Sequence, residues 1–352
     1  MAFKKLKVKV GQVTGTHTNF PTLIQPSLIT GLGSITLAEA QSARFYSDVG
    51  KTTEIAREIV SADEIHVKVT SMEALAEIWM DYDGIRSDYA VTATYGRNAV
   101  WSDYYFVYHL DDTTTSTVTD SAGNEGGSKT GANQPIENTG KINEAQDFTG
   151  GNYKIEIDTG TSAWANATQG AITAWFKTSS NANLAIYGDG SSTTNNSFMV
   201  VSVNDGVMKN NLRRSSSSDA VVAEGSTAID DNIWHKSTFY SSGSANKLYT
   251  DGVDEGASIV TEGTGFDGAW FDFANDSVAL DNHGIGVLPR TSDVVHFDGS
   301  IDELRLRKTA TGDNWETTEY NNQNANGSFW EATDAGGGGA AQVARRGAVM
   351  MM

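Results

Sequence analysis

Two carboxylates that are close together in the sequence, Glu156 and Asp158, are the first candidates for chemistry. Retaining glycoside hydrolases need two carboxylates about 5 Å apart, one acting as nucleophile and the other as acid and base. A catalytic strand of this kind reads E-x-D-x-x-E, but position 161 is Thr in this chain. The spacing therefore argues against a hydrolase built on this strand.

The histidines and cysteines give no local signature of a metal site or a nucleophile. The six histidines form no H-x-H or H-x-x-x-H pattern, so we do not expect zinc; they are His17, His66, His109, His235, His283 and His296. Cysteine is absent, which excludes disulfides and thiolate ligands. A G-x-S-x-G elbow, which would present a serine nucleophile, is also absent.

An irregular aromatic stretch is a better candidate for binding. Trp270, Phe271 and Phe273 follow one another closely, beside Asp267 and Asp272. Exposed aromatic rings can stack on sugar faces or anchor a protein partner. The alternative is a loop that folds onto its own domain. With both interpretations open, these three aromatic residues are the candidate ligand-binding site.

Composition and charge narrow the class of protein. The chain has 352 residues, a net charge of -19, 36 glycines and four prolines. An acidic chain repels phosphate backbones, so we expect no nucleic-acid partner. The beginning of the chain, MAFKKLKVKV, alternates apolar residues with lysine and predicts a first strand rather than a signal peptide. No apolar run approaches the roughly 18 residues of a membrane span, so we expect none.

Short alternating runs separated by turn residues predict an all-β chain. We expect a small N-terminal β-sandwich over 1–97 and a jelly-roll β-sandwich over 98–333. Residues 34–43 could form one helical turn or a loop. The stretch 297–322 predicts a turn, a strand and a short polar helix. Residues 334–352 read as a glycine-rich linker and a tail, either disordered or docked on a neighbouring subunit.

Four motifs of the second region resemble laminin-G-like (concanavalin A-like) jelly-roll domains. They are GAITAWFKT, NIWHKSTFY, KLYTDGVDEG and FDGSIDELRLRKTAT, in the order typical of that family. The resemblance implies a core position for Trp175 and places IDELRLR as the last strand, beside the first strand of the domain. The first region, with NFPTLI, ARFYSD, AREIVSADEIHVKV and AEIWMDYDG, resembles a domain of unknown function found upstream of such domains in phage and bacterial proteins.

The resemblance also implies a cofactor. Laminin-G-like folds often carry a structural Ca²⁺ on the rim of the sandwich, held by carboxylate and carbonyl oxygens. Asp302 in the closing strand is the leading candidate ligand, and Asp147 is a second. The alternative for Asp302 is a hydrogen-bonding role toward the neighbouring chain segment, without a metal.

The function that these features favour is a non-enzymatic structural or adhesion protein of a tailed virus particle: a capsid decoration, turret, fibre or tail component. Such a protein needs no export signal, and its jelly roll would face outward and touch host glycans. We expect other virion proteins as partners, a homo-oligomer and a position on the virion surface. The alternatives are a bacterial surface or secreted carbohydrate-binding protein and a glycosidase of the concanavalin A-like fold.

Overall fold

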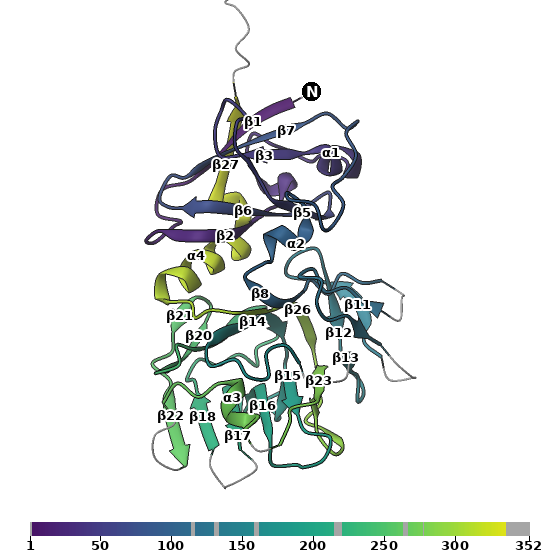
Figure 1. The fold of residues 1–352 in the computed structure, drawn as a ribbon, viewed down its shortest axis with the longest axis vertical. Helices are drawn as coiled ribbons and strands as arrows, with labels where there is room; N and C mark the ends of the chain where they lie inside the picture. The colour runs from purple at the N-terminus through teal and green to yellow at the C-terminus, as the bar shows by residue number, and fades with distance from the viewer. Residues whose placement is uncertain are drawn as a thin grey trace, which may run out of the picture.

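The computed structural model has two β-sandwich domains that follow one another along the long axis (Figure 1). It describes residues 2–113, 117–129, 134–157, 162–214, 220–262, 267–276 and 278–335. The N-terminal domain pairs a five-stranded sheet, ordered β27-β1-β7-β3-β4, with a three-stranded sheet, ordered β2-β6-β5. Its strands are β1 (Ala2–Val8), β2 (His17–Ile24), β3 (Arg44–Tyr46), β4 (Glu54–Ile55), β5 (Arg57–Ser61), β6 (Glu64–Met72), β7 (Glu77–Tyr82) and β27 (Trp330–Asp334).

The second domain is a jelly roll with two large antiparallel sheets. One sheet has the order β22-β18-β17-β16-β15-β23-β13-β10-β9, and the other has the order β11-β12-β26-β14-β19-β20-β21, with β8 paired to β26. The all-β prediction is therefore confirmed. The strands are β8 (Tyr104–Tyr108), β9 (Thr117–Val118), β10 (Gly127–Ser128), β11 (Ile136–Thr139), β12 (Glu144–Asp147), β13 (Ile155–Ile157), β14 (Gly170–Lys177), β15 (Leu184–Gly190), β16 (Phe198–Asn204), β17 (Val207–Arg213), β18 (Ala220–Glu224), β19 (His235–Ser241), β20 (Asn246–Thr250), β21 (Val253–Asp254), β22 (Ser258–Glu262), β23 (Asn282–Ile285), β24 (Leu288–Pro289), β25 (Asp293–Val294) and β26 (Ser300–Arg307).

Helices are short and few in the described ranges, and none is long and apolar enough to cross a membrane. They are η1 (Pro26–Leu28), α1 (Leu37–Ser42), α2 (Arg97–Val100), α3 (Phe271–Ala274), α4 (Asp313–Asn324) and α5 (Asn326–Phe329). Helix α1 shows that residues 34–43 contain a helical turn, which the sequence left open against a loop. Thr36 and Glu39 form a reciprocal capping box, which satisfies two backbone N–H groups at the start of the helix.

The closing strand of the jelly roll lies where the resemblance implied. β26 pairs antiparallel with β8, the first strand of the domain, and Leu304 is opposite Tyr108. The first part of β26 pairs instead with β12, where Gln146 faces Ile301. β12 and β8 thus share one edge of β26, and β14 pairs with its other edge.

The end of the described chain returns to the N-terminal domain. β27 pairs antiparallel with β1, and Trp330 and Ala332 join the N-terminal core. The sequence predicts a jelly roll that ends at 333 and a tail that begins at 334, but both residues belong to β27. The correction follows from pairing between residues more than 320 positions apart, which no local pattern reports. Residues 336–352 of the predicted tail lie outside the described residues.

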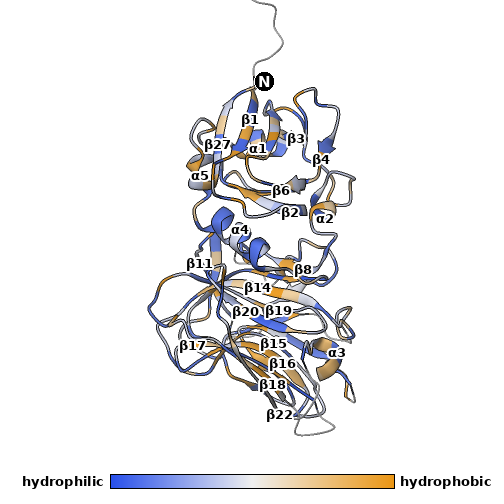
Figure 2. Cartoon of the chain, turned by 90° about the vertical axis from the view of Figure 1, so that its left-hand side faces the viewer, coloured by the Kyte–Doolittle hydropathy of each residue, from blue (hydrophilic) through white to orange (hydrophobic). Residues whose placement is uncertain are grey.

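Helix α4 lies between the two domains, and Figure 2 shows it in blue, as a hydrophilic helix at the junction. One face of it turns toward the N-terminal domain, where Trp315 packs on Phe20 at 4.7 Å between ring centroids. An adjacent face carries Glu316, Glu319 and Gln323, which contact β19, β26 and β14 of the jelly roll. The predicted polar helix is confirmed, and its polarity follows from burial between two surfaces that offer charged and polar partners.

Candidate functional site at the domain junction

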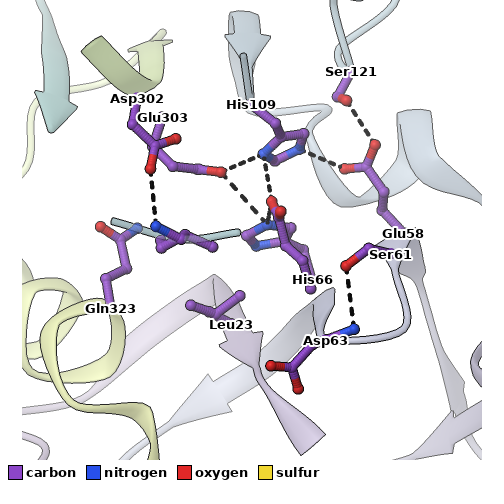
Figure 3. A network of polar contacts seen from close by, with 12 residues as sticks. Leu23, Glu58, Ser61, Asp63, His66, His109, Ser121, Asp302, Glu303 and Gln323 are labelled. Atoms are coloured by element: carbon purple, nitrogen blue, oxygen red, sulfur yellow. Dashed lines mark hydrogen bonds and ion pairs between the residues drawn. The ribbon is translucent and has the colours of Figure 1, made fainter. Parts of the chain in front are cut away.

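A cluster of charged side chains is buried where the two domains meet (Figure 3). Glu64 and His66 are two residues apart on β6, so both side chains point to the same face of that strand. His109 follows the end of β8, and Glu303 comes from β26. We call Glu64, His66, His109 and Glu303 the junction cluster; all four are almost fully buried.

The junction cluster brings two imidazoles and two carboxylates to one point. The rings of His66 and His109 stack, with centroids 4.6 Å apart. Glu64 Oε1 lies 3.2 Å from His66 Nε2 and 3.2 Å from His109 Nδ1. Glu303 Oε1 lies 2.6 Å from His109 Nδ1 and 4.0 Å from His66 Nε2. One ligand atom from each residue lies within 4.8 Å of the others, and these are atom types that bind metal ions.

A second layer of polar contacts holds the junction cluster. The other ring nitrogen of His109, Nε2, lies 3.0 Å from Glu58 Oε2. Ser121 Oγ donates to Glu58 Oε1 at 2.6 Å, and Trp101 Nε1 donates to Glu58 Oε2. Arg305 pairs with the second oxygen of Glu303. Glu58 and Arg305 therefore fix the orientation of one residue each in the junction cluster.

The pKa values at the junction follow from burial and from these pairs. Burial raises the pKa of Glu64, and the nearby carboxylate of Glu303 raises it further, against the opposing effect of His109. Burial also opposes the charge on Glu303, yet Arg305 and His109 hold its pKa well below the usual range. Burial lowers the pKa of His66, whereas Glu303 and Glu58 outweigh burial and raise the pKa of His109. Glu58, although buried, has a pKa of about 2 because of His109.

A surface pocket of about 380 Å³ opens beside the junction cluster, and Glu58 and His109 form part of its wall. We call it the junction pocket. Its lining is mostly polar and comes from both domains: Arg57, Glu58, Ile59, Val60, Asp88, Tyr89, Val91, Arg97, His109, Asp111, Asp112, Thr113, Thr119 and Ser121. The Tyr89 ring carries the Arg44 guanidinium over its face, 3.9 Å from the ring centroid. Burial raises the pKa of Asp111 to about 6 despite the nearby His109.

The predicted aromatic site is mostly core. Trp270 and Phe271 are fully buried and Phe273 is 9% exposed, all three within the main hydrophobic cluster of the jelly roll. Their rings pack inside the sandwich, so Trp270 and Phe271 present no face to a sugar. Phe273 alone lines a second pocket of about 400 Å³, which also includes the predicted neighbours Asp267 and Asp272. We call this the α3 pocket.

Asp302 and Asp147 are not members of the junction cluster, the group of His and Glu donor atoms found in the described residues. Asp302 is fully buried, and its Oδ2 accepts hydrogen bonds from the backbone N–H groups of Lys141 and Ile142, both at 2.9 Å. These two bonds are what the hydrogen-bonding alternative requires, and the calcium role of Asp302 stays a prediction. Asp147 Oδ1 accepts from the Thr149 N–H at 2.8 Å, a local turn contact.

Glu156 and Asp158 are the two carboxylates that the sequence offered for hydrolysis. Glu156 lies on β13 and forms an ion pair with Lys154. Asp158 lies outside the described residues. The junction cluster could not be predicted from the sequence, because its residues come from two strands and the position after a third and are up to 239 positions apart (303 − 64). The only local signal was the E-x-H pattern of Glu64 and His66 on a strand.

No protein-family model matches the chain, and no curated protein matches it either. Among solved structures, it is similar to domain 4 of AbnA, a GH43 extracellular arabinanase from Geobacillus stearothermophilus, in complex with arabinotriose (20% identity, 61% of this chain and 97% of that chain, TM-score 0.45). It is also similar to the CBM40 of the Ruminococcus gnavus IT-sialidase bound to α2,3 sialyllactose (18% identity, 44% and 83%, TM-score 0.37). A third is the binding domain of Paraclostridial Mosquitocidal Protein 1 (12% identity, 62% and 52%, TM-score 0.45). These are β-sandwich neighbours at low similarity, and we draw no functional conclusion from them.

Proposed function

We propose that this chain is a non-enzymatic carbohydrate-binding protein and that the junction pocket holds the sugar. The observation that carries the proposal is the lining of this pocket, which combines carboxylates, guanidinium groups and hydroxyls from both domains. Sugar hydroxyls donate and accept hydrogen bonds, so they need acceptors such as Asp112 and donors such as Arg97 at short spacing. A pocket between two domains is also a common place for small ligands.

Hydrolysis would need a carboxylate that is free to act as a base. Glu58, the most buried carboxylate of the pocket, is already hydrogen-bonded to other side chains. Both oxygens of Glu58 accept hydrogen bonds, from Ser121 and from Trp101. Its low pKa, about 2, also makes it a weak base. These contacts make Glu58 a poor candidate for a catalytic base, which supports a binding role for this residue.

A glycan array followed by calorimetry on the full chain tests the proposal. Arg97 lines the junction pocket and has one long side-chain hydrogen bond, to Asn98 Oδ1 at 3.4 Å, so its replacement leaves the fold largely intact. We expect Arg97→Ala to weaken sugar binding about tenfold or more, the usual loss for a hydrogen bond to a charged group. Asp272→Asn in the α3 pocket is the matched control, with binding unchanged. If only the control weakens binding, the aromatic insertion is the site instead.

We also propose that the N-terminal domain attaches the protein to a tailed virus particle and presents the jelly roll outward. The ends of the described chain support this arrangement. Lys4 on β1 is opposite Asp334 on β27, with an ion pair of 2.8 Å, and Figure 1 shows this sheet at the end of the molecule away from the jelly roll. Attachment at that end leaves the junction pocket and the whole jelly roll free.

Light scattering coupled to size-exclusion chromatography tests the virion proposal, because it measures the oligomeric state of the chain. We expect a discrete oligomer that depends on residues 336–352, as appendages of particles assemble by closed symmetry. A monomer that is indifferent to removal of these residues contradicts the virion proposal and favours a bacterial surface carbohydrate-binding protein. Sugar binding is measured separately, so either outcome leaves the first proposal open to its own test.

A further inference from the structure

We propose that the junction cluster binds one divalent transition-metal ion, with Zn²⁺ the best match, and that this ion joins the two domains. The ligands are Glu64, His66, His109 and Glu303. This goes beyond sugar binding, and neither proposal depends on the other. The spacing of the histidines predicts no zinc site. The proposal differs because the four ligands come together only in the folded chain.

The separations between the donor atoms fit a tetrahedral site. Zinc bonds to imidazole nitrogen and carboxylate oxygen are about 2.0–2.1 Å long, which sets the distance between neighbouring ligand atoms at roughly 3.3 Å. Glu64 Oε1 is 3.2 Å from the nearest ring nitrogens of both His66 and His109. The Glu303 oxygen is at 2.6 Å and 4.0 Å from the same two nitrogens. These four separations lie within about 0.7 Å of the tetrahedral value, and all four ligand atoms lie within 4.8 Å of one another.

The donor types favour a transition metal over calcium. Imidazole nitrogen suits zinc, iron, copper and nickel, whereas Ca²⁺ takes six to eight oxygen ligands. Two histidines among four ligands therefore argue against Ca²⁺ at this position. This separates the junction cluster from the rim site that the resemblance implied.

A second observation, independent of the four donor atoms, is the layer behind them. Ligating histidines commonly donate their other ring N–H to a carboxylate, which fixes the tautomer and the ring orientation. His109 Nε2 faces Glu58 Oε2 at 3.0 Å, and Ser121 and Trp101 fix that carboxylate in turn. Arg305 holds the outer oxygen of Glu303. Each of these contacts leaves the inner atom of the ligand directed at the cluster.

His66 adds an unsatisfied polar group. Its side chain is fully buried, it stacks on His109, and its Nδ1 has no hydrogen-bond partner among the described residues. The one hydrogen bond of this ring among the described residues joins Nε2 to the Glu64 carboxyl group, and a buried ring with an unsatisfied nitrogen is costly to retain for packing alone. A bond from Nε2 to a metal ion would account for the burial of this ring.

The position of the ligands implies what the ion would do. Glu64 and His66 belong to the N-terminal domain, and His109 and Glu303 belong to the jelly roll. An ion held by two ligands from each side fixes the angle between the domains. His109 and Glu58 also line the junction pocket, which gives the site a path to solvent.

The test measures metal content and stability in the full chain. The protein is unfolded in denaturant with a chelator, refolded in parallel with Zn²⁺, Mn²⁺, Fe²⁺ or Ca²⁺, desalted and analysed by inductively coupled plasma mass spectrometry. We expect about one equivalent of Zn²⁺ and a higher melting temperature than after metal-free refolding. X-ray absorption at the zinc edge is expected to show two imidazole and two oxygen ligands. Less than 0.1 equivalent of every transition metal, or binding of Ca²⁺ alone, overturns the proposal.

Variants locate the ion. We expect Glu64→Gln and His66→Gln to lose at least tenfold in zinc affinity, while His296→Gln, a partly buried histidine outside the cluster, keeps the wild-type stoichiometry. Because a cluster variant can also fail to fold, each is checked by circular dichroism, and the wild-type absorption spectrum decides independently. Zinc retained at full affinity by folded cluster variants would place the ion elsewhere and contradict the assignment.

Discussion

The Lys236 ammonium group lies 3.1 Å from the Glu316 carboxylate, and both side chains are almost fully buried between the jelly roll and α4. Glu319 approaches the same ammonium at 2.9 Å. Lys236 is on β19, and both glutamates belong to the helix that leads back to the N-terminal domain. The two domains are therefore held together partly by charges that have no access to water.

Lys236→Met tests how much this contact contributes to the junction. Removal of one partner from a buried ion pair leaves uncompensated charge, here on Glu316 and Glu319, and we expect a loss of about 3–5 kcal/mol in the free energy of unfolding. Lys247→Met is the matched control, since its ion pairs with Asp254 and Asp313 are solvent-exposed, and it is expected to cost less than about 1 kcal/mol. Urea denaturation of both variants measures the difference. Equal losses would mean that burial does not govern this contact.

Asp302→Asn separates a hydrogen-bonding role from the implied calcium role. Asparagine keeps an oxygen that can accept from the Lys141 and Ile142 N–H groups, so we expect stability within about 1 kcal/mol of wild type. Asp302→Ala leaves both N–H groups without their partner and is expected to cost about 1–3 kcal/mol for each. Thermal melts with and without Ca²⁺ complete the test. A calcium-dependent melting temperature that disappears in Asp302→Asn would restore the calcium interpretation.

The sequence predicts elements whose signals are local. Alternation over 300–307 and the turn residues around it identify β26, and the run of polar residues after Gly312 identifies α4. The return of β27 to β1 is not predictable in this way, because a strand pattern does not name its partner. The same limit hides the junction cluster, where Glu64 and Glu303 meet only after both domains have formed. The burial of Trp270 and Phe271 is hidden for a related reason: an irregular stretch with large rings has the same composition whether it is exposed or buried.

Gly31→Ala tests the seating of β27 on the N-terminal domain. Gly31 has a φ of +88°, and a Cβ there would lie 1.9 Å from the carbonyl oxygen of Ala332 on β27. Gly33 is the matched control, with a φ of +73° and no heavy atom within 4 Å of an added Cβ. Each alanine bears the left-handed backbone cost of about 1–2 kcal/mol, but only Gly31→Ala must also displace β27.

We therefore expect Gly31→Ala to lose clearly more stability than Gly33→Ala in urea denaturation. Hydrogen exchange in β1 gives a second readout, since Leu6 is opposite Ala332 in this sheet. Faster exchange along the β27 edge of β1 in Gly31→Ala alone is the expected result. Identical exchange in both variants would show that β27 contributes little to the domain.

The stability of the jelly roll is expected to depend on pH through His235. Partial burial opposes the charge on this ring, but Asp251 at 2.8 Å and Asp231 at 3.2 Å outweigh it and raise the pKa of His235 above its ordinary value. A group with a raised pKa in the folded state binds its proton more tightly there than in the unfolded chain. Its contribution to stability is complete below the unfolded value of about 6.5 and is lost as the pH rises through the folded value.

We would measure this contribution from the melting temperatures of the wild type and His235→Gln. Measurements between about pH 5.5 and pH 9 bracket the pKa of a histidine. We expect the wild type to exceed the variant most at the acidic end, because the imidazolium pairs with both carboxylates only there, and the difference to shrink as the ring loses its proton. Asp251→Asn should flatten the wild-type profile, since it removes the stronger of the two partners. A difference that grows toward alkaline pH would reverse the sign of this linkage and show that His235 is buried as the neutral ring.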